Sequence, residues 1–166
     1  IVAMLGATAR GAVWSSCSPD FGVQGVVDRF GQIEPTVLFT VDGYWYNGRP
    51  MPILDKVGQI VARLPTVERV VVVPYLEQSA GTRSDLAAVR GAVPWDVWLA
   101  PFLPGPLDYV ALPFDHPLYI LYSSGTTGVP KCIVHGAGGT LLQHLKELVL
   151  HGDVKAGDRL FYFTSC

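Results

Sequence analysis

Three short apolar runs without polar alternation constrain the fold of this chain more than any other feature. They are TVLFTV (36–41), VERVVVVPYL (67–76) and LYILY (118–122). A strand that is apolar on both sides must be covered on both faces, which is typical of parallel sheets. Residues 53–64 carry apolar side chains at helical spacing and end at Pro65. The alternation predicts an α/β fold with a largely parallel sheet covered by helices.

Other segments complete this expected pattern. Helices are predicted at residues 1–9, at FGVQGVVDRF (21–30) with Asp20 as its N-cap, and around 141–149, before Gly152. DGYWYNGR (42–49) predicts a hairpin or turn, because Asp-Gly and Asn-Gly are turn pairs.

The last part of the pattern is less regular. Residues 77–117 have little periodicity, and we expect a surface excursion there with one short helix near 85–89. RLFYF (159–163) predicts a further strand near the C-terminal end.

The composition suggests a piece of a larger body. Hydrophobic residues make up 49% of the 166 residues and charged residues only 16%, against roughly 25% charged in typical globular proteins. So few charges cannot coat a compact surface, and we expect exposed apolar patches. The segments at the two ends, a helix and a strand, fit the same expectation.

Charge and cysteine content exclude several functions. The net charge is -2 without a basic run, which argues against nucleic acid and anionic membranes as partners. The three cysteines are far apart and lack metal-ligand spacing, so no metal site is expected. No apolar run approaches about 18 residues, the length that a membrane span needs. We therefore expect a cytoplasmic location.

The segment SSGTTGVPK (123–131) follows the third apolar run directly and carries the chemistry. Gly125 and Gly128 permit positive φ and close approach of a ligand to the backbone. Successive backbone N–H groups in such a turn form an anion site, the Ser and Thr hydroxyls add donors, and Lys131 adds a positive charge. Ligands bind beyond the carboxyl ends of strands in α/β sheets. The segment predicts a polyphosphate site.

Two other interpretations of this segment have less support. The G-x-x-x-x-G-K-[ST] loop fails on spacing, since Pro130 takes the place of the second glycine and Cys132 that of Ser or Thr. A flexible Gly/Ser/Thr connection is the other alternative, but such linkers rarely follow a buried strand directly or carry a single Lys after a Pro.

YSSGTTGVPK resembles the phosphate-binding signature of the adenylate-forming enzymes. WSSCSPDFG, VDGYWYNG and KCIVHGAGGTLLQHLKE narrow the resemblance to the acetoacetyl-CoA synthetases (acetoacetate–CoA ligases), and it covers essentially the whole chain. It implies that residues 1–166 are part of the large N-terminal AMP-binding domain, incomplete at both ends, without the C-terminal domain.

The resemblance also implies an activity and a site. The parent enzyme would use ATP, Mg²⁺ and coenzyme A to convert acetoacetate into an acyl-adenylate and then a thioester. No catalytic set would be complete within these residues, so the chain alone would be inactive and its macromolecular partners would be the rest of the enzyme. The expected ATP phosphate-binding residues are Ser123, Ser124, Gly125, Thr126, Thr127, Gly128 and Lys131.

Two alternatives remain open at this point. The first is a related acetyl- or propionyl-CoA synthetase, because few residues of the acyl pocket are expected in this chain. The second is a non-catalytic module that binds nucleotide or serves as an interaction surface.

Overall fold

A computed structural model describes residues 1–76, 85–123 and 128–162. Within these residues the chain forms two compact units. The described residues of the first unit are 1–16, 106–123 and 131–162, and those of the second unit are 17–76, 85–105 and 128–130.

The second unit is built on a three-stranded parallel sheet. Its strands are β2 (Val37–Val41), β5 (Arg69–Val73) and β6 (Ala92–Pro94), in the order β2-β5-β6. Helix α3 (Leu54–Ala62) connects the β2 region to β5. The predicted strands at 36–41 and 67–76, the helix at 53–64 and the parallel pairing are confirmed.

The fully buried apolar core also lies in the second unit. Val70, Val71 and Val72 on β5 are at most 3% exposed, because this central strand is paired on both sides. Helices α2 (Val23–Phe30) and α3 add further buried side chains. The other buried hydrophobic residues are Val26, Phe30, Ile53, Val57, Ile60, Val61, Leu64, Val67 and Val89. Burying one such side chain stabilises the folded state by about 1.5–3 kcal/mol relative to leaving it exposed.

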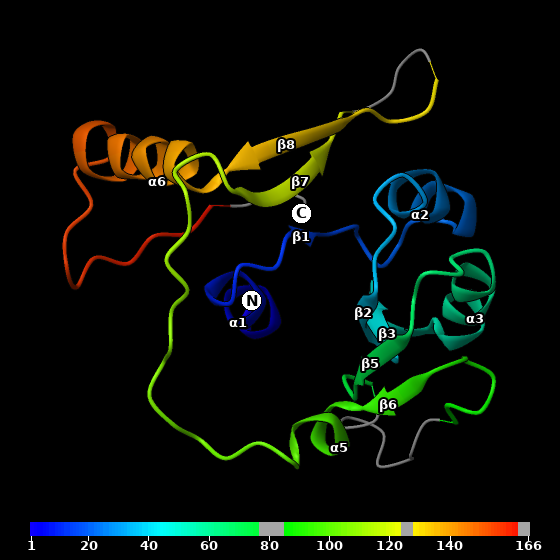
Figure 1. Ribbon diagram of the computed structural model, residues 1–166. Coiled ribbons are helices and arrows are strands. Elements are labelled where there is room, and N and C mark those ends of the chain that lie inside the picture. The colour runs from blue at the N-terminus through cyan, green and yellow to red at the C-terminus, as the bar shows by residue number, and fades with distance from the viewer. Residues whose placement is uncertain (77–84, 124–127, 163–166) are drawn as a thin grey trace. The chain divides into compact units, whose positions relative to one another are not determined.

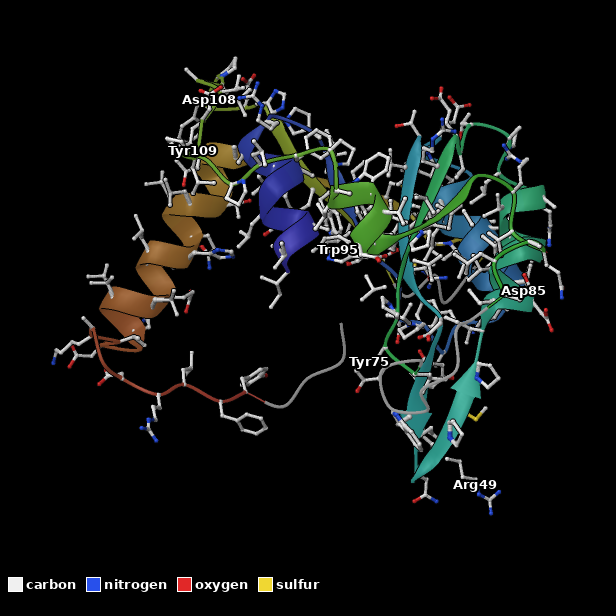
Figure 2. All side chains as sticks on the ribbon, turned by 90° about the horizontal axis from the view of Figure 1, so that it is seen from below. Arg49, Tyr75, Asp85, Trp95, Asp108 and Tyr109 are labelled. Atoms are coloured by element: carbon white, nitrogen blue, oxygen red, sulfur yellow. The ribbon has the colours of Figure 1, made fainter. Side chains whose placement is uncertain are left out.

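The predicted hairpin is present as β3 (Gly43–Tyr46) and β4 (Arg49–Pro52). Asn47 and Gly48 both have positive φ, 47° and 73°, as the mirror-image turn of a two-residue hairpin requires. Figure 2 shows Arg49 at the outer end of this hairpin.

Asp42 connects the hairpin, the sheet and α3. Its side chain is buried, and Oδ1 accepts hydrogen bonds of 2.8 Å from the N–H groups of both Tyr75 and Leu76. Its backbone N–H donates to the carbonyl of Val73, and its carbonyl accepts from Ile53 at the start of α3. One residue therefore fixes the carboxyl ends of two parallel strands.

The first unit contains a mixed sheet. The strands β1 (Trp14–Ser15), β7 (Pro117–Tyr122) and β8 (Cys132–Gly136) lie in the order β1-β7-β8. Strand β1 is parallel to β7, whereas β8 is antiparallel to it (Figure 1).

Helices at both ends of the chain complete the first unit. Helix α1 (Val2–Ala9) precedes β1. Helix α6 (Ala137–Leu145) follows β8 and continues as the π-helix η1 (Lys146–His151), which ends at Gly152 as predicted.

Several predictions were wrong, for reasons of pairing. Only part of the fold is a parallel sheet: the chain has a mixed α/β fold with small sheets, because β8 and the β3–β4 hairpin are antiparallel. Residues 85–89 form no helix, and the regular elements in this part of the chain are β6 and, after it, α5 (Trp95–Leu99). Residues 159–162 form no strand, because none of the described strands pairs with them.

The predicted N-cap of α2 was also wrong. The helix begins at Val23 with Gly22 as its N-cap, whereas Asp20 lies earlier, in a turn. Asp20 carries an electrostatic role instead, since its charge acts on the Lys56 ammonium.

The first unit leaves many apolar side chains in water, as the composition predicted. Leu141, Leu142, Leu145 and Leu148 along α6 and η1 are all exposed. No helix within the described residues is long and apolar enough to cross a membrane.

We expect Asp42→Ala to lower the free energy of unfolding by about 2–3 kcal/mol, since it leaves the Tyr75 and Leu76 amides without their buried acceptor. Urea unfolding of the chain measures this. Glu68→Ala removes an exposed carboxylate from the same unit and should change the stability by about 0.5 kcal/mol at most. Equal losses for the two variants would contradict this role of Asp42.

Candidate phosphate-binding loop

The predicted phosphate-binding segment connects two antiparallel strands. Strand β7 ends at Tyr122 and β8 begins at Cys132, and these two residues are paired across the ladder. Strands β7 and β8 therefore form an antiparallel pair (Figure 1), and residues 123–131 lie between them in the sequence. Sequence reasoning predicted β7 but missed β8, because Ile133 and Val134 on it are exposed and its pattern lacks the continuous apolar run of a buried strand.

The two ends of the segment are joined by reciprocal hydrogen bonds. The Ser123 N–H donates to the Lys131 carbonyl at 3.0 Å, and the Lys131 N–H donates to Ser123 Oγ at 3.2 Å. These are the first and last residues of the predicted site. The two bonds fix where the chain leaves β7 and where it enters β8.

Gly128 and Pro130 belong to the described part of the loop. Gly128 has a φ of 152°, a conformation that residues with a side chain rarely adopt, although a Cβ there would meet no atom within 4 Å. Position 128 therefore favours glycine because of its backbone conformation, and not because a side chain would lack room. Pro130 is buried, and its carbonyl accepts a 2.8 Å hydrogen bond from Nε2 of Gln32.

Four of the predicted site residues, Ser124, Gly125, Thr126 and Thr127, lie outside the described residues. Of the remaining three, the structure brings Ser123 and Lys131 together at the base of the hairpin, and it gives Gly128 its unusual backbone conformation. Gln32 is a contact that sequence reasoning missed, because no local pattern links residues 98 positions apart.

The hairpin distinguishes this loop from phosphate loops that open a helix. There, the helix dipole and the first N–H groups face the anion. Here β8 separates the loop from α6, whose first two N–H groups donate to the carbonyls of His116 and Phe114. The N-terminus of α6 therefore does not open directly onto this segment, and Lys131 at the end of the segment is exposed.

The histidines near the loop have structural contacts. The His135 ring on β8 lies 5.2 Å from the ring of Tyr119 on β7, and Nε2 of His116 is 2.9 Å from the Gly11 carbonyl. Among the described residues, no group of three or more His, Cys, Asp or Glu side chains could hold a metal ion.

Two side chains of the second unit have shifted pKa values: Cys17, which precedes α2, and Lys56, which lies on α3. Burial raises the pKa of the Cys17 thiol to about 11, and the nearby positive charge of Arg29 opposes this only partly. Desolvation lowers the pKa of Lys56, and the charge of Asp20 opposes that shift. The Lys56 ammonium donates to the carbonyls of Pro19 and Phe21 at 2.5 and 3.0 Å, which holds the segment leading into α2.

Comparison with known proteins identifies the class. The model of the AMP-binding enzyme family matches residues 1–166. The chain therefore belongs to the AMP-binding enzyme family.

Relatives within that family are more specific. The chain is 55% identical over 168 residues to an acetoacetyl-coenzyme A synthetase of Rhizobium meliloti, an alignment that covers 100% of the chain and 25% of the relative. It is 49% identical over 171 residues to a malonamoyl-CoA synthetase of Penicillium aethiopicum, covering 100% of the chain and 23% of that protein. The chain thus spans about a quarter of the length of these curated relatives.

A solved structure agrees with these sequences. The acetoacetyl-CoA synthetase from Streptomyces lividans matches with a TM-score of 0.87 and 47% identity, over 98% of this chain and 24% of that one. The predicted resemblance to the acetoacetyl-CoA synthetases is confirmed.

The raised pKa of Cys17 predicts that its thiol is alkylated slowly and that the rate keeps rising to an unusually high pH. At pH 8 the thiolate population should be about 100-fold below that of an ordinary cysteine, and the rate should rise about tenfold per pH unit until about pH 11. Iodoacetamide labelling followed by mass spectrometry of the Cys17 peptide measures this, with the urea-unfolded chain as control. A rate that levels off near pH 9 in the folded chain contradicts the prediction.

The same shift has a consequence for stability. The folded state favours the neutral thiol, so the contribution of Cys17 to the free energy of unfolding is fully present below its unfolded pKa of 9.0 and is lost as the pH rises through about 11.

Proposed function

We propose that this chain is part of an ATP-dependent acid–CoA ligase that forms AMP, and that residues 123–131 bind the β- and γ-phosphates of ATP. The observation that carries the proposal is the closed hairpin loop, with Ser123 and Lys131 joined at its base. A closed glycine-rich loop places several N–H and O–H donors around one anion. Membership in the AMP-binding enzyme family supports ATP as the source of that anion.

The proposed reaction has two steps. A carboxylate oxygen attacks the α-phosphorus of ATP, and the bond to the β-phosphate oxygen breaks, which gives an acyl-adenylate and pyrophosphate. The thiolate of coenzyme A then attacks the acyl carbon and releases AMP. The loop acts in the first step, because its donors stabilise the negative charge that develops on the leaving pyrophosphate. Lys131 acts as a phosphate contact and not as a nucleophile.

We further propose that the acid is short and carries a carbonyl group at its third carbon. The relatives are named for acetoacetyl and malonamoyl groups, at 55% and 49% identity. These two acyl groups share the carbonyl at the third carbon and differ in a terminal methyl or amino group. Acetoacetate is the first candidate, and acetate or propionate are the alternatives that lack the extra carbonyl.

The remaining parts of the catalyst lie, in this proposal, in the rest of a longer ligase. That includes the partners of adenine and ribose, most of the acyl pocket, and the residues that complete the catalytic set. Mg²⁺ would arrive with the phosphates of ATP, which supply much of its coordination in such sites. Two free cysteines, Cys17 and Cys132, agree with the proposed cytoplasmic location.

The acid preference can be tested by ATP–pyrophosphate exchange. In the longer ligase that carries this chain, acetoacetate and malonamate should support exchange, and acetate and propionate should be at least about tenfold slower. A site that pairs with the second carbonyl loses those hydrogen bonds with the shorter acids. Equal or faster exchange with acetate would refute the proposed substrate class but not the ligase activity.

The phosphate contact is tested by Lys131→Ala in the same enzyme. The KM for ATP in the exchange reaction should rise about tenfold or more, as expected for the loss of a hydrogen bond to a charged group. Lys155→Ala is the matched control, because Lys155 is exposed and its ammonium pairs with Asp153 at 2.8 Å. If both variants keep the wild-type KM, Lys131 does not bind phosphate.

A further inference from the structure

The chain contains a single asparagine, Asn47, and a glycine follows it directly. The two residues form the turn between β3 and β4, where their φ values are 47° and 73°. Both residues are exposed, and Arg49, which begins β4, lies at the outer end of the hairpin (Figure 2). Asn47 is therefore at the tip of an exposed element, where solvent reaches its side-chain amide.

The backbone nitrogen of Gly48 is an accessible nucleophile beside that amide. The last pair of the β3–β4 ladder joins Tyr46 to Arg49, so the ladder makes no use of the Gly48 N–H. Glycine has no Cβ, and beyond its chain neighbours no described atom lies within 4 Å of the place where a Cβ on Gly48 would stand. Neither strand pairing nor crowding therefore keeps this nitrogen from the side chain of Asn47.

The hairpin can open far enough for the nitrogen to attack. In the described part of the chain, β3 and β4 pair only with each other, and every residue of β4 is exposed. A two-stranded hairpin is marginally stable by itself, and exposed turns open locally at little cost in free energy. Opening frees the rotation about the Cα–C bond of Asn47 that lets the Gly48 nitrogen approach Cγ.

Asp42-Gly43 is the other turn pair that the sequence predicts at this hairpin, and its surroundings are the opposite. Oδ1 of Asp42 accepts hydrogen bonds from the Tyr75 and Leu76 N–H groups, and the Asp42 backbone makes two more. A Cβ on Gly43 would come within 2.3 Å of a side-chain carbon of Leu76. These contacts lock the dihedral angles that an attack would have to change. The hairpin thus carries one locked pair and, at Asn47, one open pair.

We propose that Asn47 is a site of spontaneous deamidation, with water as the co-reactant, and that the pair at 42–43 is protected. The Gly48 nitrogen gives its proton to solvent base and attacks Cγ of Asn47. The new N–Cγ bond replaces the Cγ–Nδ2 bond, and ammonia leaves, which gives a five-membered imide. Water then opens the imide on either side, to aspartate or to isoaspartate, without oxidation or reduction. The reaction does not depend on the function proposed above.

Isoaspartate alters the hairpin because it routes the main chain through Cγ. The turn then contains one additional backbone carbon, and the mirror-image geometry of two residues with positive φ is lost. The Tyr46–Arg49 pair that closes the ladder should therefore open. A negative charge also replaces the neutral amide close to Arg49.

Peptide mapping of the aged chain tests the proposed site. The wild-type chain is incubated at neutral and mildly alkaline pH, folded or in urea, and isoaspartate is measured by mass spectrometry and by isoaspartyl methyltransferase labelling. Deamidation at Asn47 in the folded chain should be within about tenfold of the unfolded rate, because the turn opens readily. Asn47→Gly keeps a residue that tolerates positive φ, and it should remove most of the labelling.

Asp42→Asn is the matched control. It places a second Asn-Gly pair in the locked position, where its Oδ1 can still accept both hydrogen bonds. Deamidation at position 42 of the folded variant should be at least about 100-fold slower than at Asn47, because it requires the end of the sheet to open. Equal rates at the two positions, or conversion of wild-type Asn47 in urea only, overturn the proposal.

Deuterium exchange of a peptide spanning residues 43–52 measures the effect on the hairpin. Exchange should be faster in the isoaspartyl chain than in the fresh chain, and a peptide covering β5 should stay unchanged as the internal control. Unchanged exchange in the 43–52 peptide overturns the proposed opening of the hairpin. Faster exchange in both peptides shows a general loss of structure and overturns it as well.

Discussion

The double pairing of β5 is the constraint on which the second unit depends. Its valines are buried because β2 and β6 take up hydrogen bonds on both of its edges, and α2 and α3 contribute the apolar cover. A strand in that position must be apolar on both faces and cannot carry charge at its centre. Asp42, placed just beyond the carboxyl end of β2, uses its buried carboxylate to hold the backbone that leaves β5. The polar contacts of this unit thus lie at the edge of the sheet, and its apolar contacts lie inside.

Whether a helix or strand could be predicted from the sequence depends on whether its own residues or its partner strand stabilise it. Strands β2, β5 and β7 and helix α3 were predictable, because their own residues carry the apolar pattern, although only β5 and α3 contain buried residues. Strand β8 is defined by its pairing with β7, and β6 by its pairing with β5, so their sequences carried too little signal. Residues 159–162 have a strand's composition but pair with none of the strands in the described part of the chain, and composition alone does not make a strand.

The candidate site shows the same division. Hydroxyls, glycines and one lysine after a strand led to the prediction of a phosphate loop, which stays a prediction, and Gly128 has the positive φ expected of a glycine there. The sequence could not reveal that the loop closes an antiparallel hairpin through Ser123 and Lys131. Nor could it reveal Gln32, whose carbonyl partner at Pro130 is 98 positions away. Long-range contacts of single side chains have no local pattern, so only coordinates disclose them.

The pairing of β1 with β7 bears on how the chain matures on the ribosome. Ser15 Oγ donates to the Ile120 carbonyl at 2.8 Å, across 105 positions of sequence. The second unit is drawn almost entirely from the intervening residues 17–105 and can bury its valines as soon as they have emerged. At about 5–20 residues per second, β1 and the apolar helix α1 wait roughly 5–20 s for their partner strand. During that interval β1 lacks β7, the strand that it pairs with in the described part of the chain.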